Sequence, residues 1–188
     1  MEVKKKNQIL NSLIFSKICI GSSLSNVDPT QFSNLLGHRR FLFSLLNPFL
    51  VQHSLKAAFL FLEGFVKNNY ELFFVINTKD LIFFQRFHTT CKNKNYLLLK
   101  ASEVSSGFLT NKKISNMVII TLFLDQRKVE LIQKESILMK IPIISFSDLA
   151  SNKFSSSVYV FGNFNSFFSQ NLILNLISVC LNKNNEHS

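Results

Sequence analysis

The chain is poor in the residues that phosphate-binding loops, disulfide scaffolds and zinc sites require. Its 188 residues include five glycines, three prolines, three cysteines and no tryptophan. No GxGxxG or GxxxxGK[ST] motif occurs, which argues against dinucleotide and P-loop sites. Cys19, Cys91 and Cys180 lie far apart and belong to no CxxC or Cys/His cluster. We therefore expect no disulfide framework, no metal and no cofactor.

Charged residues are few, and their balance is strongly basic. They make up 17% of the chain, with 21 Lys and Arg against 11 Asp and Glu, so the formal net charge is +10. A compact domain with this charge attracts polyanions, although a basic enzyme is an alternative explanation. The hydrophobic fraction of 47% suits a single domain with a substantial core.

Two long apolar stretches raise the question of a membrane span. Residues 154–182 carry no charge but are interrupted by serine, asparagine and glutamine, and residues 41–55 contain an Asn-Pro pair, a glutamine and a histidine. Hydrocarbon tolerates such interruptions poorly, so we expect no membrane span.

Apolar runs alternate with amphipathic, helix-like segments. The runs predict strands near 72–76, 96–100, 118–124, 141–147 and 157–161, with helices near 54–66, from 79 or 80, over 127–140 and over 166–183. In "VIITLFLDQRKVELIQKESILMKIPIISFSD" (118–148), strand, helix and strand follow directly, as in a parallel βαβ unit. The sequence therefore predicts one α/β domain over 36–182, an N-terminal extension over 1–35 and a disordered tail over 183–188.

Ligands of doubly wound sheets bind where the strands end, so the residues after the first and third strands are the candidate ligand-binding positions. These are Asn77, Thr78, Lys79, Asp125, Gln126, Arg127 and Lys128. No second acid follows the first strand to share a magnesium ion with Asp125. We expect the Asp125 carboxylate to cap the next helix, and Asp148 to end a strand and shape a loop. No histidine motif or Ser/His/Asp arrangement occurs, so no catalytic residue is assigned and no enzyme activity is expected.

Basic residues form five clusters, mostly in predicted loops and termini. They are Lys4, Lys5 and Lys6; Arg39 and Arg40; Lys92 and Lys94; Lys112 and Lys113; and Arg127 and Lys128. Such side chains neutralise nucleic-acid phosphates, although a solvated face explains any one cluster taken alone. Together they favour a nucleic-acid surface.

Several short motifs follow one another in a characteristic order. "GHRR", "NP", "LFFVINTKD" and "GFLTN" precede a segment with two strands that end in aspartate. The matching residues of that segment are Asp125, Arg127, Lys128, Glu135, Ile141, Pro142, Asp148, Gly162, Asn163 and Ser166. In this order and spacing, over about residues 36–180, the chain resembles the small-subunit ribosomal protein two family.

The resemblance implies a three-layer, flavodoxin-like fold with five parallel strands in the order 2-1-3-4-5. It also implies a structural role in translation, with contacts to the ribosomal RNA of the small subunit and to neighbouring ribosomal proteins. Asp125, Pro142, Asp148, Gly162 and Asn163 would then have structural roles, and the basic loops would contact RNA.

The chain departs from the family in ways that indicate a shortened, organelle-encoded mitochondrial version, located in the matrix. The helical hairpin that the family carries after "GFLTN" is reduced to residues 112–116, and Phe161 replaces a proline. The abundant Phe, Asn, Lys, Ile and Leu have A/T-rich codons. Two alternatives stay open: an α/β enzyme or binding domain for a phosphorylated small ligand at the Asn77/Asp125 crevice, and a peripheral membrane protein with a Phe-rich surface.

Overall fold

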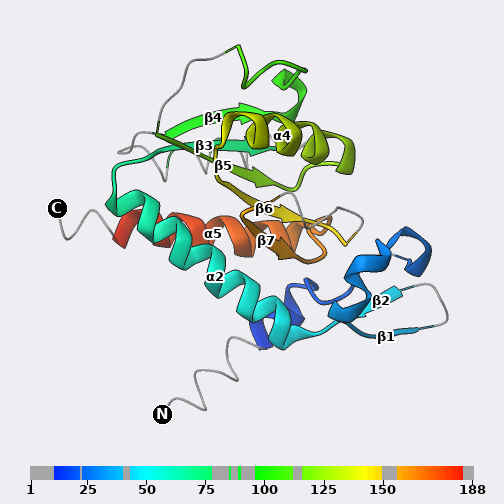
Figure 1. The fold of residues 1–188 in the computed structure, drawn as a ribbon. Coiled ribbons are helices and arrows are strands. Elements are labelled where there is room, and N and C mark those ends of the chain that lie inside the picture. The colour runs from blue at the N-terminus through cyan, green and yellow to red at the C-terminus, as the bar shows by residue number, and fades with distance from the viewer. Residues whose placement is uncertain are drawn as a thin grey trace.

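The fold is that of a computed structural model, which describes residues 11–21, 23–39, 43–77, 85, 89, 96–111, 116–149 and 156–183. A five-stranded sheet runs through these residues in the order β4-β3-β5-β6-β7 (Figure 1). Counted along the chain, this order is 2-1-3-4-5. The predicted three-layer, flavodoxin-like α/β fold is therefore confirmed.

The strands lie close to their predicted positions. They are β3 (Glu71–Ile76), β4 (Tyr96–Lys100), β5 (Met117–Leu122), β6 (Ile143–Ser147) and β7 (Val158–Phe161), and every neighbouring pair is parallel. β5 ends two residues earlier than predicted, because Phe123 has a φ of 60° that no extended strand can contain. β6 begins two residues later, since Pro142 lacks the N–H group that a central strand donates.

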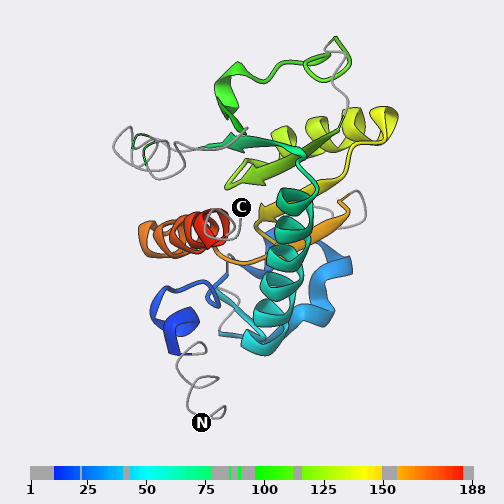
Figure 2. The same ribbon diagram turned by 90° about the vertical axis from the view of Figure 1, so that its left-hand side faces the viewer.

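Three helices cover the two faces of the sheet. They are α2 (Pro48–Lys67), α4 (Gln126–Met139) and α5 (Phe167–Lys183). α2 and α5 lie together on one face, and α4 lies on the other, so that the sheet forms the middle layer (Figures 1 and 2). The helix predicted from residue 79 or 80 falls mainly outside the described residues.

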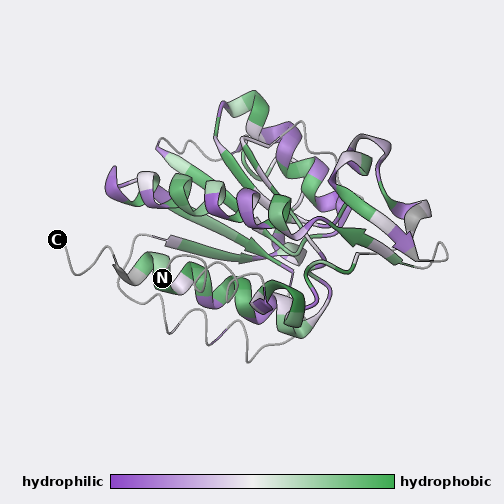
Figure 3. Cartoon of the chain, turned by 90° about the horizontal axis from the view of Figure 1, so that it is seen from below, coloured by the Kyte–Doolittle hydropathy of each residue, from purple (hydrophilic) through white to green (hydrophobic). Residues whose placement is uncertain are grey.

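Alternate residues of each strand pack against opposite helical layers. Phe74 and Ile120 belong to the core beneath α2 and α5, whereas Phe73 and Ile119 belong to the core beneath α4. The strands can be apolar on both faces because helices cover both. The helices, in contrast, alternate apolar and polar segments along their length (Figure 3), as expected when one side faces the sheet and the other faces solvent.

The described residues between 11 and 35 pack into the domain core, which corrects the predicted N-terminal extension over 1–35. Leu13, Ile18 and Val27 are buried in the same core as α2 and α5. Two 3₁₀ helices, Leu24–Asn26 and Pro29–Asn34, lead into a hairpin of β1 (Leu35–Arg39) and β2 (Phe43–Leu46) that the sequence did not predict. Backbone groups of residues 18–21 hold the segment in place, because they bond to β2 and to Asn163 in the turn after β7. Residues 1–10 and most of the tail lie outside the described part of the chain.

α2 begins six residues earlier than predicted. The sequence predicted a break at Asn47 and Pro48, but the Asn47 side chain accepts the Phe49 N–H at 3.1 Å and Pro48 occupies the first helical turn. Proline is favoured there because its fixed φ suits the helix and its missing N–H is not needed. By length and composition alone, α2 is the one helix of the described residues that could cross a membrane, and 22% of its apolar window is buried.

Two of the three cysteines lie in the core. Cys19 and Cys180 are buried, and Cys91 lies outside the described residues. Burial raises the pKa of the Cys19 thiol to about 11, because a thiolate loses solvation there. Cys19 is therefore a protonated core residue at neutral pH rather than a nucleophile.

Candidate functional site

Asp125 occupies the N-cap position of α4, as predicted, but it does not cap with its side chain. Its backbone carbonyl accepts the N–H groups of Lys128 and Val129 at 3.0 and 3.1 Å, whereas its exposed carboxylate makes no capping bond. The prediction of a carboxylate cap was therefore wrong. The side chain stays available at the carboxyl end of the sheet.

The predicted basic surface is described by the structure only in part. Arg127 is exposed at the start of α4. Lys128 is half-buried, and its Nζ donates to the Val104 carbonyl at 2.6 Å, so its ammonium group holds a loop in place. The other candidates lie outside the described residues or, for Arg39, have a backbone in β1 but no described side chain. These are Lys4, Lys5, Lys6, Arg39, Arg40, Lys92, Lys94, Lys112 and Lys113.

Glu135 joins α4 to the "GFLTN" segment. One carboxylate oxygen accepts the Gly107 N–H at 2.6 Å, and the other accepts the Leu109 N–H at 2.9 Å. Glu135 is only 8% exposed, so these two charge-assisted bonds satisfy a carboxylate that burial would otherwise destabilise. Gly107 has a φ of 82°, a conformation that favours glycine. The link therefore depends on the carboxylate of Glu135 and on the glycine at position 107.

Gly162 and Asn163 form the seat for the N-terminal segment. A Cβ on Gly162 would lie 2.8 Å from Ile18 Cγ2, so only glycine lets the two backbones approach. Asn163 binds the segment through two hydrogen bonds. Its backbone N–H donates to the Ile18 carbonyl at 2.9 Å, and its side-chain amide donates to the Ile20 carbonyl. Their predicted structural role thus has a physical basis. Pro142, also predicted as structural, accepts the Ile119 N–H just before β6.

Asp148 shapes the turn after β6. Its Oδ1 accepts the Leu149 N–H at 3.1 Å, its Oδ2 accepts the Asn165 amide at 3.3 Å, and its backbone carbonyl accepts the Tyr159 hydroxyl at 2.7 Å. Burial raises the pKa of the Asp148 carboxyl above its ordinary range, and the Leu149 N–H opposes this shift. The residue shapes a loop as predicted, and it also presents a partly desolvated carboxyl group.

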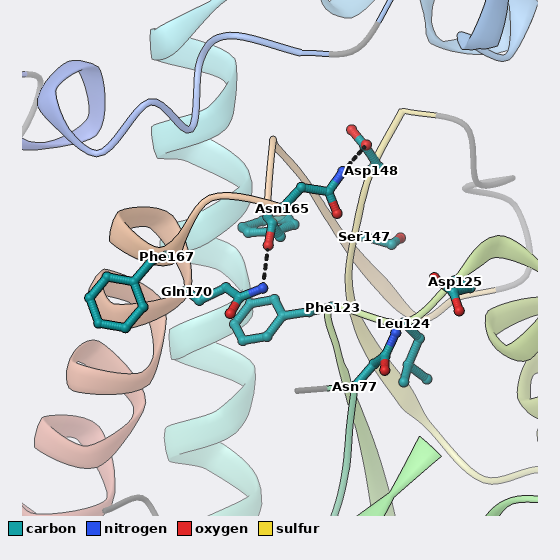
Figure 4. A pocket seen from close by; sticks show the side chains of 10 residues that line it. Asn77, Phe123, Leu124, Asp125, Ser147, Asp148, Asn165, Phe167 and Gln170 are labelled. Atoms are coloured by element: carbon teal, nitrogen blue, oxygen red, sulfur yellow. Dashed lines mark hydrogen bonds between the residues drawn. The ribbon is translucent and has the colours of Figure 1, made fainter. Parts of the chain in front are cut away.

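A pocket of about 380 Å³ opens at the carboxyl ends of β3, β5 and β6 (Figure 4). Asn77, Asp125, Ser147 and Asp148 line it from the strand ends. Figure 4 places Asn165 and Asp148 at one end of the pocket and Asn77 at the other. The structure thus brings Asn77 and Asp125 together at the crevice that the sequence predicted.

The second wall comes from the start of α5, which sequence reasoning did not include in the site. Phe164, Asn165, Phe167 and Gln170 contribute it, with Phe123 beside them. The Gln170 amide donates to the Phe164 carbonyl at 2.8 Å, which holds the wall in shape. The sequence offered one signal, the turn "GNFNS" after the last strand, but nothing in it placed that turn against β3.

The described lining of the pocket is acidic and aromatic. It has two carboxyl groups, three amides and a hydroxyl but no lysine or arginine. Among the described residues no group of three or more His, Cys, Asp or Glu could hold a metal ion. The chemistry available is therefore hydrogen bonding, mainly to donors, and stacking on rings.

Fold and site together define a doubly wound, flavodoxin-like α/β domain with a polar pocket at the carboxyl edge of its sheet. No protein-family model matches the chain, and no curated protein matches it in sequence.

Proposed function

We propose that the chain is a structural component of the small subunit of a mitochondrial ribosome, where it binds ribosomal RNA and neighbouring ribosomal proteins. The observation that carries the proposal is the strand order 2-1-3-4-5, which is the order that the family resemblance implies. The proposed role is to hold an assembly together rather than to catalyse a reaction.

The contacts of the motif residues support the proposal. Glu135 and the "GFLTN" segment are two separate matches to the family. Two hydrogen bonds join them, across 28 and 26 positions of the chain. Gly162 and Asn163 likewise bind a segment more than 140 residues away. Residues that join distant segments in this way specify a fold, so a match at them carries more weight than a match at scattered surface positions.

Charge supplies the second support. The net charge of +10 makes the whole molecule attractive to a polyanion, and exposed Arg127 stands at the N-terminus of α4. Oriented N–H groups at a helix N-terminus add a positive partial charge at the same place. Arginine beside such a terminus suits a phosphate of an RNA backbone.

Sedimentation tests the proposal. Organelle lysate is separated on a gradient in high salt with magnesium, and the chain is detected with a specific antibody. We expect it in the small-subunit fractions, and at the top of the gradient after ribonuclease treatment. If the chain stays at the top without ribonuclease, the proposal is wrong.

The pocket favours a second candidate function, an α/β domain that binds a small ligand. It lies at the Asn77/Asp125 crevice, where doubly wound enzymes hold substrates. A phosphorylated ligand suits it less well, since two carboxyl groups and no cationic side chain belong to the described lining. Calorimetric titration of the full chain with nucleoside phosphates would show saturable binding if this second function were correct.

A further inference from the structure

The described lining of the pocket is acidic, whereas the chain as a whole is basic. Asp125 and Asp148 lie in its wall, whereas the whole chain carries a formal charge of +10. A free phosphate entering the pocket would meet two carboxyl groups without a cationic side chain of the described lining to offset them. The lining therefore selects a neutral or cationic group that carries hydrogen-bond donors.

Aromatic rings give the pocket a preference for flat groups. Phe123 and Phe164 lie at its inner side with ring centroids 5.7 Å apart, and Phe167 is 52% exposed at its α5 side. Exposure of a ring next to a pocket leaves a surface on which a planar group can stack. A nucleobase is a planar group that stacks on aromatic side chains in this way.

Polar groups in the wall retain unused hydrogen-bonding capacity. Ser147 is 1% exposed, and no described residue lies within hydrogen-bond geometry of its hydroxyl. The Tyr159 hydroxyl donates to the Asp148 carbonyl, and its pKa is raised mainly by burial and lowered by its interaction with the Ser147 hydroxyl. A buried hydroxyl without a partner is costly, and a ligand in the pocket could supply one.

Asp148 can also accept further bonds. Each of its carboxylate oxygens accepts one donor, Leu149 N–H or the Asn165 amide, and a carboxylate oxygen has room for two. Asn77, at the opposite end, has a half-buried side chain whose amide can both donate and accept. Acceptors at one end and an amide at the other can form hydrogen bonds with different edges of one base.

We propose that this pocket holds a single unstacked nucleobase of the RNA that the chain binds, with guanine preferred. The inference rests on the proposed function. Guanine presents two adjacent donors, N1–H and its exocyclic amino group, which the Asp148 carboxylate can accept together, and an acceptor on another edge, N7, to which the Asn77 amide can donate. Uracil presents one donor between two acceptors and fits the same wall poorly.

Arg127 completes the arrangement. It is exposed and lies two residues after Asp125, which is in the pocket wall. A nucleotide with its base in the pocket would carry its phosphate outside the pocket, where exposed Arg127 can offset the charge of Asp125. The pocket then reads the base while the basic exterior holds the backbone, the usual division of labour in RNA recognition.

Binding of nucleosides and short RNAs to the full chain tests the inference. Guanosine, adenosine, cytidine and uridine carry no phosphate and probe the pocket alone. Two single-stranded RNAs that differ only in one central guanine or uracil probe the base within a backbone. The decisive variant is Asp148→Asn, with Glu71→Gln as the control, since Glu71 is exposed at the opposite, amino end of β3.

The inference predicts saturable guanosine binding, weaker binding of uridine and tighter binding of the guanine RNA. Asp148→Asn should weaken guanosine binding about tenfold, as loss of a paired base contact does, and Glu71→Gln should not. Equal binding of both RNAs with no nucleoside binding would overturn the inference and leave the proposed RNA function standing. Guanosine binding without RNA binding would overturn it too, and would favour the small-ligand function instead.

Discussion

Asp148 carries a carboxyl group that the fold makes harder to ionise. Burial raises its pKa in the folded state above the ordinary value of 3.8, so the folded chain holds this proton more tightly than the unfolded chain. Stability therefore falls as pH rises through the interval between the two values, and the deficit stays constant at higher pH. The ionised carboxylate costs stability at neutral pH.

Replacing Asp148 with Asn should raise the free energy of unfolding at pH 7. The amide oxygen can still accept the Leu149 N–H, the bond that is lost is the exposed 3.3 Å one from Asn165, and no charge is desolvated. Urea unfolding at a series of pH values measures this, and the advantage should disappear below about pH 3.8. The variant keeps Asp125 in the same pocket wall and Asp28, whose charge acts on Tyr159. A loss of stability at neutral pH would contradict the account.

The buried carboxylate of Glu135, in contrast, stabilises the fold, because each of its oxygens accepts a backbone N–H. Changing it to Gln leaves one acceptor for the two N–H groups of Gly107 and Leu109, and we expect a loss of about 1–3 kcal/mol. Glu130→Gln on the same helix is the control, because the bond described for Glu130 is an exposed one from the Gln126 amide. Chemical denaturation should separate the two variants. Equal stabilities would mean that the link to residues 107–109 is weak.

At the scale of elements, the sequence was informative wherever buried strands dominate. All five strands of the sheet carry apolar runs, and α4 and α5 begin within a residue of their predicted starts. The start of α2 was missed because Pro48 was interpreted as a break rather than as a first-turn residue. β1 and β2 were missed because they are short, contain polar residues, and lie outside the main sheet.

Only part of the pocket lining could be predicted from the sequence. Asn77 and Asp125 follow strands, and the order of the strands determines that parallel strand ends meet at one edge. Asn165 and Gln170 could not be assigned, because their position depends on how α5 packs against the sheet, which periodicity does not determine. The partner of the Lys128 ammonium, a backbone carbonyl 24 residues away, was equally invisible.

The packing of the N-terminal segment against the residue after β7 can be tested at Gly162. An added Cβ would lie 2.8 Å from Ile18 Cγ2 and 3.0 Å from Phe164 Cζ, so Gly162→Ala should cost about 1–3 kcal/mol. Gly64→Ala is the matched control: nothing lies within 4 Å of its added Cβ, and the helix should gain about 0.5–1 kcal/mol. Thermal unfolding of both variants checks the prediction. If Gly162→Ala is neutral, residues 18–20 do not depend on this contact.

The start of α4 supplies the RNA prediction at the element scale. Arg127→Glu should weaken RNA binding at every base composition and make the dependence of log K on log salt shallower by about one. Arg127 should be changed without Lys128, whose ammonium group supports the loop at Val104. Lys56→Glu, exposed on α2, is the control of equal charge change. Filter binding at several salt concentrations measures both, and equal effects would show that α4 has no special contact.

The whole molecule presents two kinds of surface that an assembly would cover. Its net charge of +10 suits RNA, whereas Phe49, Leu60 and Phe61 leave α2 with an exposed apolar side. An exposed apolar side of a helix is a candidate surface for protein contact. Both features agree with the proposed assembly of RNA and protein.

A density map of the small ribosomal subunit purified from the organelle tests this account most directly. We expect a five-stranded parallel sheet in the order 2-1-3-4-5 at its surface, with the side chains of this sequence and with ribosomal RNA against the N-terminus of α4. A complete map in which every protein density belongs to other chains would contradict the account.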